Sequence, residues 1–115
     1  MNTNLNNMYE PTVWGPKFWS ILHLGTMLYP ENPSQTYKER MKWFIWGIPV
    51  IIPCDICRDH ATAYITKREN EINTVVSSKQ ELFKFFVDFH NAVNKRYGKP
   101  VLSYEEAYAL YNQSG

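Results

Sequence analysis

Hydrophobic residues recur along this chain at intervals of three and four, the spacing that places them on one face of an α-helix. The pattern predicts four long helices, at about residues 15–29, 34–48, 53–68 and 78–97, and a short fifth helix at about 103–112. The fourth helix has the most regular apolar stripe, which consists of Leu82, Phe86, Phe89, Val93 and Tyr97. We therefore expect an all-α fold, a four-helix bundle with a short fifth helix packed against it.

Turn and capping residues agree with these boundaries. Gly98 and Pro100 end the fourth helix, and Ser103 followed by Glu106 forms a capping-box pattern at the start of the fifth. The only strand signal is a weak one at residues 74–76. In the first helix, one side is expected to carry Phe18, Leu22, Gly25 and Tyr29.

Composition and charge narrow the class of protein. The 115 residues suffice for one domain over 1–115, whose first ten or so residues read as a polar tail. A net charge of +1 without long runs of one sign argues against nucleic-acid or anionic-membrane binding. No apolar run is long enough to span a bilayer, and the polar N-terminus lacks a secretion signal, so we expect a cytoplasmic protein. Aromatic residues make up 16% of the chain, and some of them must line a pocket or an interface.

The two cysteines form a Cys54-Asp55-Ile56-Cys57 motif. A disulfide across so small a loop stabilises little, so a redox or metal-binding role is favoured. Pro53 is expected to place Cys54 in the first turn of the third helix and Cys57 one turn later. The amides of a helix N-terminus, together with Arg58, would favour the thiolate.

Three other interpretations of the motif stay open at this stage. The first is an inert pair of buried thiols. The second is a zinc site formed by Cys54, Cys57, His60 and either His90 or His23, in a helical binding module without catalysis. The third is a dithiol carrier that holds no flavin. A thioredoxin-like motif is disfavoured because the chain lacks a βαβ pattern.

The fourth helix carries an unusual set of polar residues among its aromatic ones. His90 and Asn94 are four apart and share one edge of the apolar stripe, while Asn91 and Lys95 lie further round. They could be a satisfied core histidine and solvated asparagines. They could also bind a ligand that combines ring systems with phosphates.

Basic and aromatic residues nearby fit the ligand interpretation. Arg96 and Lys99, which follow Lys95, would suit the phosphates. In the first helix, Trp19 and His23 lie one turn apart and could face the fourth helix to wall an aromatic cofactor.

Together these segments resemble the FAD-dependent sulfhydryl oxidases of the Erv/ALR family. The matching motifs, in order along the chain, are Gly15-x3-Trp19-x3-His23, Tyr29-Pro30, Pro53-Cys54-x2-Cys57, His90-Asn91-x-Val93-Asn94-Lys95 and Gly98-Lys99-Pro100. The scarcity of cysteines is similar to the viral branch of that family.

The resemblance implies FAD bound noncovalently within the bundle, with no metal. It implies that Cys57 lies next to the flavin and that Cys54 exchanges with the incoming dithiol. The residues that the resemblance assigns to cofactor binding are Gly15, Trp19, His23, His90, Asn91, Val93, Asn94, Lys95, Tyr97, Lys99 and Tyr111. His60 departs from the pattern, because cellular members place an acidic residue there.

The resemblance also implies the partners. Cellular members carry an additional shuttle disulfide that this chain lacks, so a separate protein dithiol substrate or a small dithiol carrier protein is expected to deliver electrons, and molecular oxygen to accept them. A homodimer without intersubunit disulfides is expected as well. In the second helix, Tyr37, Met41, Phe44 and Ile48 are predicted to face inward. At least one of Trp43 and Trp46 is then left on an outer flank, where it could form a contact surface.

Overall fold

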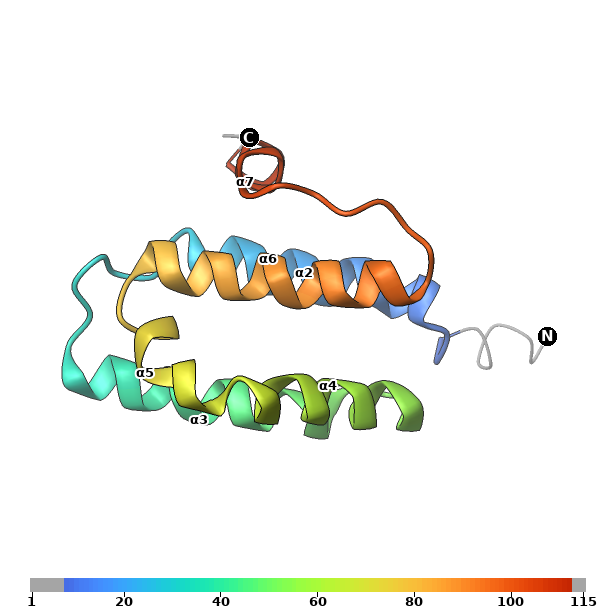
Figure 1. Ribbon diagram of the computed structural model, residues 1–115, viewed down its shortest axis with the longest axis horizontal. Coiled ribbons are helices and arrows are strands. Elements are labelled where there is room, and N and C mark those ends of the chain that lie inside the picture. Colours follow the sequence, from blue (N-terminus) through green and yellow to red (C-terminus); the bar gives the residue numbers. More distant parts are fainter. Residues whose placement is uncertain (1–7, 113–115) are drawn as a thin grey trace.

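The computed structural model of the protein describes residues 8–112, all of whose regular elements are helical. The elements are α2 (Pro11–Thr26), α3 (Gln35–Ile51), α4 (Asp55–Lys67), the 3-10 turn η1 (Glu69–Glu71), α5 (Ile72–Val75), α6 (Lys79–Arg96) and α7 (Tyr104–Tyr111). The long helices form two layers, α2 beside α6 and α3 beside α4, and α7 packs against α2 and α6 on the far side from α3 and α4 (Figure 1). The predicted four-helix bundle with a short fifth helix is confirmed, and α5 is an additional single turn.

Side-chain caps explain where most of these helices begin. The N-cap residues whose side chains accept a first-turn backbone N–H are Ser34, Cys54, Ser78 and Ser103. The predicted capping box is confirmed: Ser103 Oγ accepts from the Glu106 N–H at 3.0 Å, and the Glu106 carboxylate accepts from the Ser103 N–H at 2.8 Å. Gly98 follows α6 with φ 70°, a conformation that favours glycine, so the predicted stop is confirmed too.

The first long helix begins earlier than predicted. Pro11 occupies its first position, where the missing N–H costs nothing, and Pro16 is accommodated inside the helix. The helix ends at Thr26, so Tyr29 lies in the following turn, where its hydroxyl donates to the Val76 carbonyl at 2.8 Å. Gly25 is exposed, contrary to the prediction that it lies on the inner side.

The predicted inward stripe of α3 is wrong at two of its four positions. Tyr37 and Phe44 are 51% and 49% exposed. Ile45 and Ile48 are buried instead, with Met41 half-buried beside them. The buried face of α3 therefore runs through positions 41, 45 and 48. The helix is rotated relative to the prediction, because apolar residues occur on several of its faces and the pattern fits more than one rotation.

The weak strand signal at residues 74–76 is also wrong. Residues Ile72–Val75 form the single turn α5, and Val75 and Val76 are buried in the core. A strand needs a partner to satisfy its backbone groups, and a short turn between α4 and α6 buries the same valines without one.

Two hydrophobic clusters hold the helices together. The larger lies between the layers and has large buried side chains at its centre, among them Ile45, Ile65, Leu82, Phe85 and Phe86. Truncating such a phenylalanine typically costs about 3–5 kcal/mol. The smaller cluster fixes α7 to α6 and consists of Phe83, Val87 and Ala107, with Met27 and Leu102 packed against it. Within residues 8–112, no helix combines the length and the apolar character that crossing a membrane requires.

Candidate functional site: a disulfide beside an aromatic cavity

The cysteine motif lies where α3 gives way to α4. Cys54 is the N-cap of α4 rather than a residue of its first turn, and its Sγ accepts the Cys57 N–H at 3.3 Å. The two cysteines form a disulfide, with Cα atoms 5.2 Å apart. Arg58 donates from Nε to the Ile52 carbonyl at 2.6 Å and thereby fixes the segment that leads into the motif.

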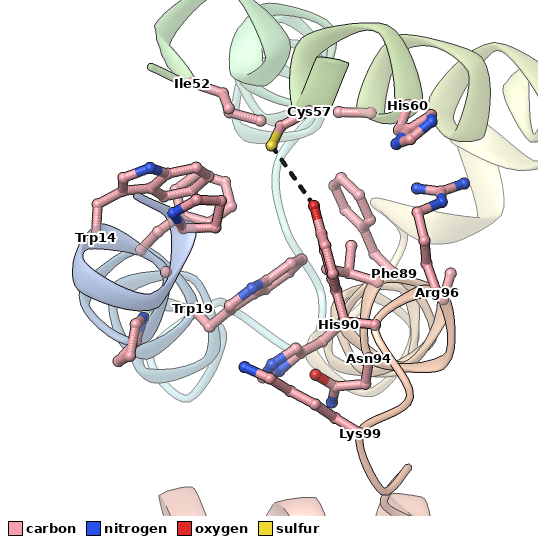
Figure 2. A pocket seen from close by; sticks show the side chains of 18 of the residues that line it. Trp14, Trp19, Ile52, Cys57, His60, Phe89, His90, Asn94, Arg96 and Lys99 are labelled. Carbon is pink, nitrogen blue, oxygen red and sulfur yellow. Dashed lines mark hydrogen bonds between the residues drawn. The ribbon is translucent and has the colours of Figure 1, made fainter. Parts of the chain in front are cut away.

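A cavity of about 590 Å³ opens beside this disulfide, and Cys57 lines it whereas Cys54 does not. Figure 2 shows Cys57 on one side, facing Trp19 and His90 across the cavity. Its aromatic walls come from α2, α4, α6 with its C-cap, and α7, and consist of Trp14, Phe18, Trp19, Tyr64, Phe89, His90, Tyr97 and Tyr111. Such walls suit a ligand with flat ring systems.

Two histidines, the buried His23 and the half-buried His90, form a pair at the cavity wall. His90 stacks on Trp19, with ring centroids 4.2 Å apart and planes 6° apart. His23 Nε2 and His90 Nδ1 share a hydrogen bond of 3.1 Å, and Tyr111 stacks on His23 with centroids 4.4 Å apart. His23 Nδ1 is buried and has no hydrogen-bond partner among the described residues.

Burial makes both histidines weak bases. Desolvation by burial, together with a smaller effect of the neighbouring His90, lowers the pKa of His23 to about 4. Desolvation likewise lowers the pKa of His90 to about 4, with the charge of Lys99 adding to the effect. Both imidazoles are therefore neutral at pH 7, where one donates and the other accepts the shared proton.

Basic residues line the same cavity near its outer end. Arg96 and Lys99 belong to the lining, and Figure 2 places them beside His60 and Asn94 respectively. A guanidinium and an ammonium at the edge of an aromatic cavity suit a phosphate-bearing ligand.

The structure gathers most of the predicted site residues around this cavity. Those that line it are Gly15, Trp19, Cys57, His90, Val93, Asn94, Tyr97, Lys99 and Tyr111. His23 lies behind His90, and Lys95 is exposed outside the lining.

Asn91 also lies outside the lining, and its side chain has a different partner. Its amide donates to the Leu102 carbonyl at 2.7 Å and accepts the Leu102 N–H at 3.0 Å. This pair of hydrogen bonds ties the segment between α6 and α7 to α6. Asn91 thus fixes the chain that carries Lys99 and, through α7, Tyr111.

Some lining residues were not among the predicted set. On α4, His60, Ala61 and Tyr64 follow Cys57 at intervals of three, four and seven residues, so the helical spacing itself could have indicated them. Trp14 and Phe18 share a ridge of α2 in the same way.

The zinc interpretation finds no support in this geometry. Cys54 and Cys57 are joined in the disulfide. Across residues 8–112, no three His, Cys, Asp or Glu side chains are grouped so that they could hold a metal ion.

Comparison with known proteins gives a consistent result. The sequence model of the Erv1 / Alr family matches residues 16–112. A relative from Invertebrate iridescent virus 6 is 45% identical over 96 residues, which cover 81% of this chain and 86% of the relative. The FAD-linked sulfhydryl oxidase of African swine fever virus is 38% identical over 104 residues, covering 88% of this chain and 82% of the viral protein. The crystal structure of the yeast Erv1 core superposes with a TM-score of 0.82 at 26% identity, covering 92% of this chain and 86% of the yeast chain.

Proposed function

Because the chain belongs to the Erv1/Alr family, we propose that it is an FAD-linked sulfhydryl oxidase that introduces disulfide bonds into protein substrates. The observation that carries the proposal is the position of Cys57, whose sulfur belongs at once to a disulfide and to the wall of an aromatic cavity. A disulfide so placed can exchange electrons with a flat cofactor on one side and with thiols on the other.

The cavity has the features that FAD requires. Its volume of about 590 Å³ lies within the range of roughly 300–1,000 Å³ that is typical of ligand sites. A Cβ at Gly15, which lines the cavity, would meet no atom within 4 Å apart from its chain neighbours and the backbone of its own helix, so the glycine leaves that space to a ligand. Trp19, His90 and Tyr111 would hold the flat ring systems, while Arg96 and Lys99 would hold the diphosphate.

Some of the remaining residues predicted to bind the cofactor line the cavity, and others lie behind or outside its wall. Val93, Asn94 and Tyr97 line the cavity and are proposed to contact FAD. His23 supports His90 from behind, and Asn91 positions the segment after α6. Lys95 stays a prediction, since its exposed side chain lies outside the lining.

The chemistry of the chain's own residues is thiol–disulfide exchange. A substrate thiolate attacks Cys54 Sγ, the Sγ–Sγ bond breaks, and its electron pair leaves on Cys57 Sγ. A second substrate thiolate then attacks the substrate sulfur of the mixed disulfide, which releases the oxidised substrate and the Cys54 thiolate. The cofactor, when bound, supplies the two-electron acceptor that passes these electrons to oxygen and yields hydrogen peroxide.

We infer the different roles of the two sulfurs from their positions. Cys54 lies outside the cavity at the start of α4, which supports a role in exchange with incoming thiols, and Cys57 lines the cavity, which supports a role in electron transfer to the cofactor. Ile51, which precedes the motif, and Ile56, which lies between its two cysteines, are exposed and would contact a protein dithiol or a small carrier protein.

We also propose that the protein is a homodimer and acts in the cytoplasm. Support for the dimer comes from the outer face of α3, where Trp43 and Trp46 are 69% and 41% exposed and Val50 follows on the same face. Support for the location is limited to composition: both cysteines belong to the active pair, and none remains for the structural disulfides common in secreted proteins.

The decisive experiment combines a spectrum with an oxygen electrode. The purified protein should be yellow, contain about one FAD per chain, and consume oxygen when dithiothreitol is added. Cys57→Ser should retain FAD and lose the oxygen consumption. A colourless protein with one zinc ion would instead support the binding module, and a colourless protein that exchanges disulfides would support the flavin-free carrier.

A further inference from the structure

We propose that Tyr97 is a catalytic residue whose hydroxyl hydrogen-bonds the Cys57 sulfur and stabilises the thiolate that forms there when the disulfide opens. The inference rests on the proposed oxidase function and adds a role beyond cofactor binding. Tyr97 Oη lies 3.9 Å from Cys57 Sγ, within the range of hydrogen bonds to sulfur, and the dashed line in Figure 2 marks the contact.

The backbone holds Tyr97 in this position. Tyr97 is the C-cap of α6, and its N–H donates to the carbonyls of Val93 and Asn94 at 3.2 Å each. Gly98 then turns the chain with a positive φ, and the Lys99 N–H returns to the Asn94 carbonyl at 2.8 Å. The phenol therefore projects from a fixed point at the end of α6 towards the start of α4.

The two sulfurs have different hydrogen-bond donors. The backbone N–H of Cys57 donates to Cys54 Sγ at 3.3 Å, so the donor at the helix N-terminus serves Cys54. For Cys57 Sγ, the Tyr97 hydroxyl is the one hydrogen-bond partner within residues 8–112. A phenol has one O–H to donate, and the sulfur is a much better acceptor once it carries a charge.

This difference matters at the moment when the disulfide opens. Attack of a substrate thiolate on Cys54 forms one S–S bond and breaks another, and the electron pair of the broken bond stays on Cys57 Sγ as a thiolate. The Tyr97 O–H then holds that charge without giving up its proton. Its effect is to make Cys57 a better leaving group and to keep it as the charged, electron-rich form that faces the cofactor.

Other charged and titratable groups line the same cavity and also influence the charge state of the Cys57 thiol. They are Glu10 ahead of α2, His60 and Tyr64 on α4, His90 and Arg96 on α6, and Lys99 and Tyr111 beyond it. None of them changes when the Tyr97 hydroxyl alone is removed, so a Tyr97→Phe variant isolates the hydrogen bond.

The chain permits a direct test because it contains only two cysteines. In a Cys54→Ser background, Cys57 is the sole thiol, and its rate of alkylation by iodoacetamide as a function of pH reports the thiolate. We expect Tyr97→Phe in that background to shift the midpoint of the profile to higher pH and to slow alkylation at neutral pH by roughly tenfold to a hundredfold, the value of a hydrogen bond to a charged group. The matched control is Tyr108→Phe, which removes an exposed phenol outside the cavity and should leave the profile unchanged.

Flavin absorbance and melting temperature measured on the same FAD-loaded samples separate the outcomes. A shifted midpoint with flavin retained supports the role of Tyr97. A midpoint equal to that of the Tyr108→Phe control overturns it. Alkylation needs neither flavin nor oxygen, so a protein that binds no FAD would overturn the proposed function, and the Tyr97–Cys57 contact would still be tested by the same profile.

Discussion

The imidazole of His90 lies flat against the indole of Trp19, with the ring centroids 4.2 Å apart. The stack joins α6 to α2, and the hydrogen bond between His90 and His23 fixes the rotation of the imidazole from its other edge. Phe89 adds an edge-to-face contact with Trp19 at 5.1 Å. The protein therefore holds this wall of the cavity in place before any ligand binds. Little conformational entropy is then lost when a flat cofactor binds.

Acidification is expected to destabilise the fold through His23. Its pKa is about 4 in the folded protein against 6.5 in the unfolded chain. Between these values the unfolded chain binds a proton that the folded chain does not, so the free energy of unfolding falls as the pH falls through this window. For His23 the loss between pH 7.5 and pH 5 is on the order of 2 kcal/mol, or roughly 5–10 °C in melting temperature.

The contribution of His23 can be separated from that of other groups by mutation. His23→Gln keeps a polar side chain of similar size and removes the titration, so the variant should lose markedly less stability than the wild type between the same two pH values. Thermal melts of both proteins at pH 7.5 and pH 5 give the comparison. Equal losses would show that burial does not lower the pKa of His23 in the folded protein.

The two asparagines of α6 should respond differently to the same substitution. Asn91→Leu removes both hydrogen bonds to Leu102 and is expected to cost about 1–3 kcal/mol of stability. Asn94→Leu alters the cavity wall instead, so it should weaken FAD binding while the melting temperature of the flavin-free protein stays nearly unchanged.

Melting curves and flavin titrations on both variants test this pair. The matched substitution on one helix is its own control, because helix propensity and the added apolar side chain are the same. If Asn91→Leu lost flavin affinity without any loss of stability in the flavin-free protein, the structural assignment of Asn91 would be wrong.

The sequence predicted the helices and the cavity better than it predicted individual partners. Spacing along one helix was sufficient to place His90 and Asn94 near one another, since helical geometry fixes which residues share a face. Contacts between distant segments have no such signature. The hydrogen bonds between Asn91 and Leu102 and the contact between Tyr97 and Cys57 depend on how α6 is rotated and where the chain turns after it.

The error in α3 has a related cause. Apolar residues occupy several faces of this helix, so periodicity alone left its rotation undetermined, and Phe44 was placed inside while Ile45 occupies the core. The same surplus leaves Trp43 exposed, as predicted for at least one of the two tryptophans of this helix. An excess of apolar residues thus makes the buried face of the helix hard to predict from the sequence. The same excess indicates that another face of the helix contacts a partner.

The reactivity of the two cysteines should reveal which one faces the substrate. Cys57→Ser leaves Cys54 as the sole thiol, and Cys54→Ser leaves Cys57. Because Cys54 lies outside the cavity and accepts a hydrogen bond from the helix N-terminus, it should react with a bulky aromatic disulfide at least about tenfold faster than Cys57.

Denaturant provides the control for that comparison, since the two rates should become similar once the fold is lost. The FAD-loaded proteins should give the larger difference, because a cofactor in the cavity narrows the approach of a bulky reagent to Cys57. Faster reaction of Cys57 in the folded protein would reverse the assigned roles.

The proposed dimer is expected to form through the exposed surface of α3. Trp43, Trp46 and Val50 lie on one exposed face, and Gly47, which lies between them, is exposed as well. Such a face exposes large apolar side chains, which suits burial against a second copy of the chain. Sedimentation under reducing conditions at micromolar concentration is expected to give the mass of two chains.

Two substitutions locate the interface. Trp43→Glu places a charge on the α3 face and should yield the single-chain mass with flavin and melting behaviour retained, because the side chain is 69% exposed and contributes little to the core. Leu28→Glu, at an exposed position after α2, introduces the same charge elsewhere and should leave the dimer intact. A wild-type protein that sediments as one chain would rule out the dimer. A dimer broken by Leu28→Glu and not by Trp43→Glu would move the interface from α3 to the side of α2, while the oxidase site, built within one chain, would be unaffected in either case.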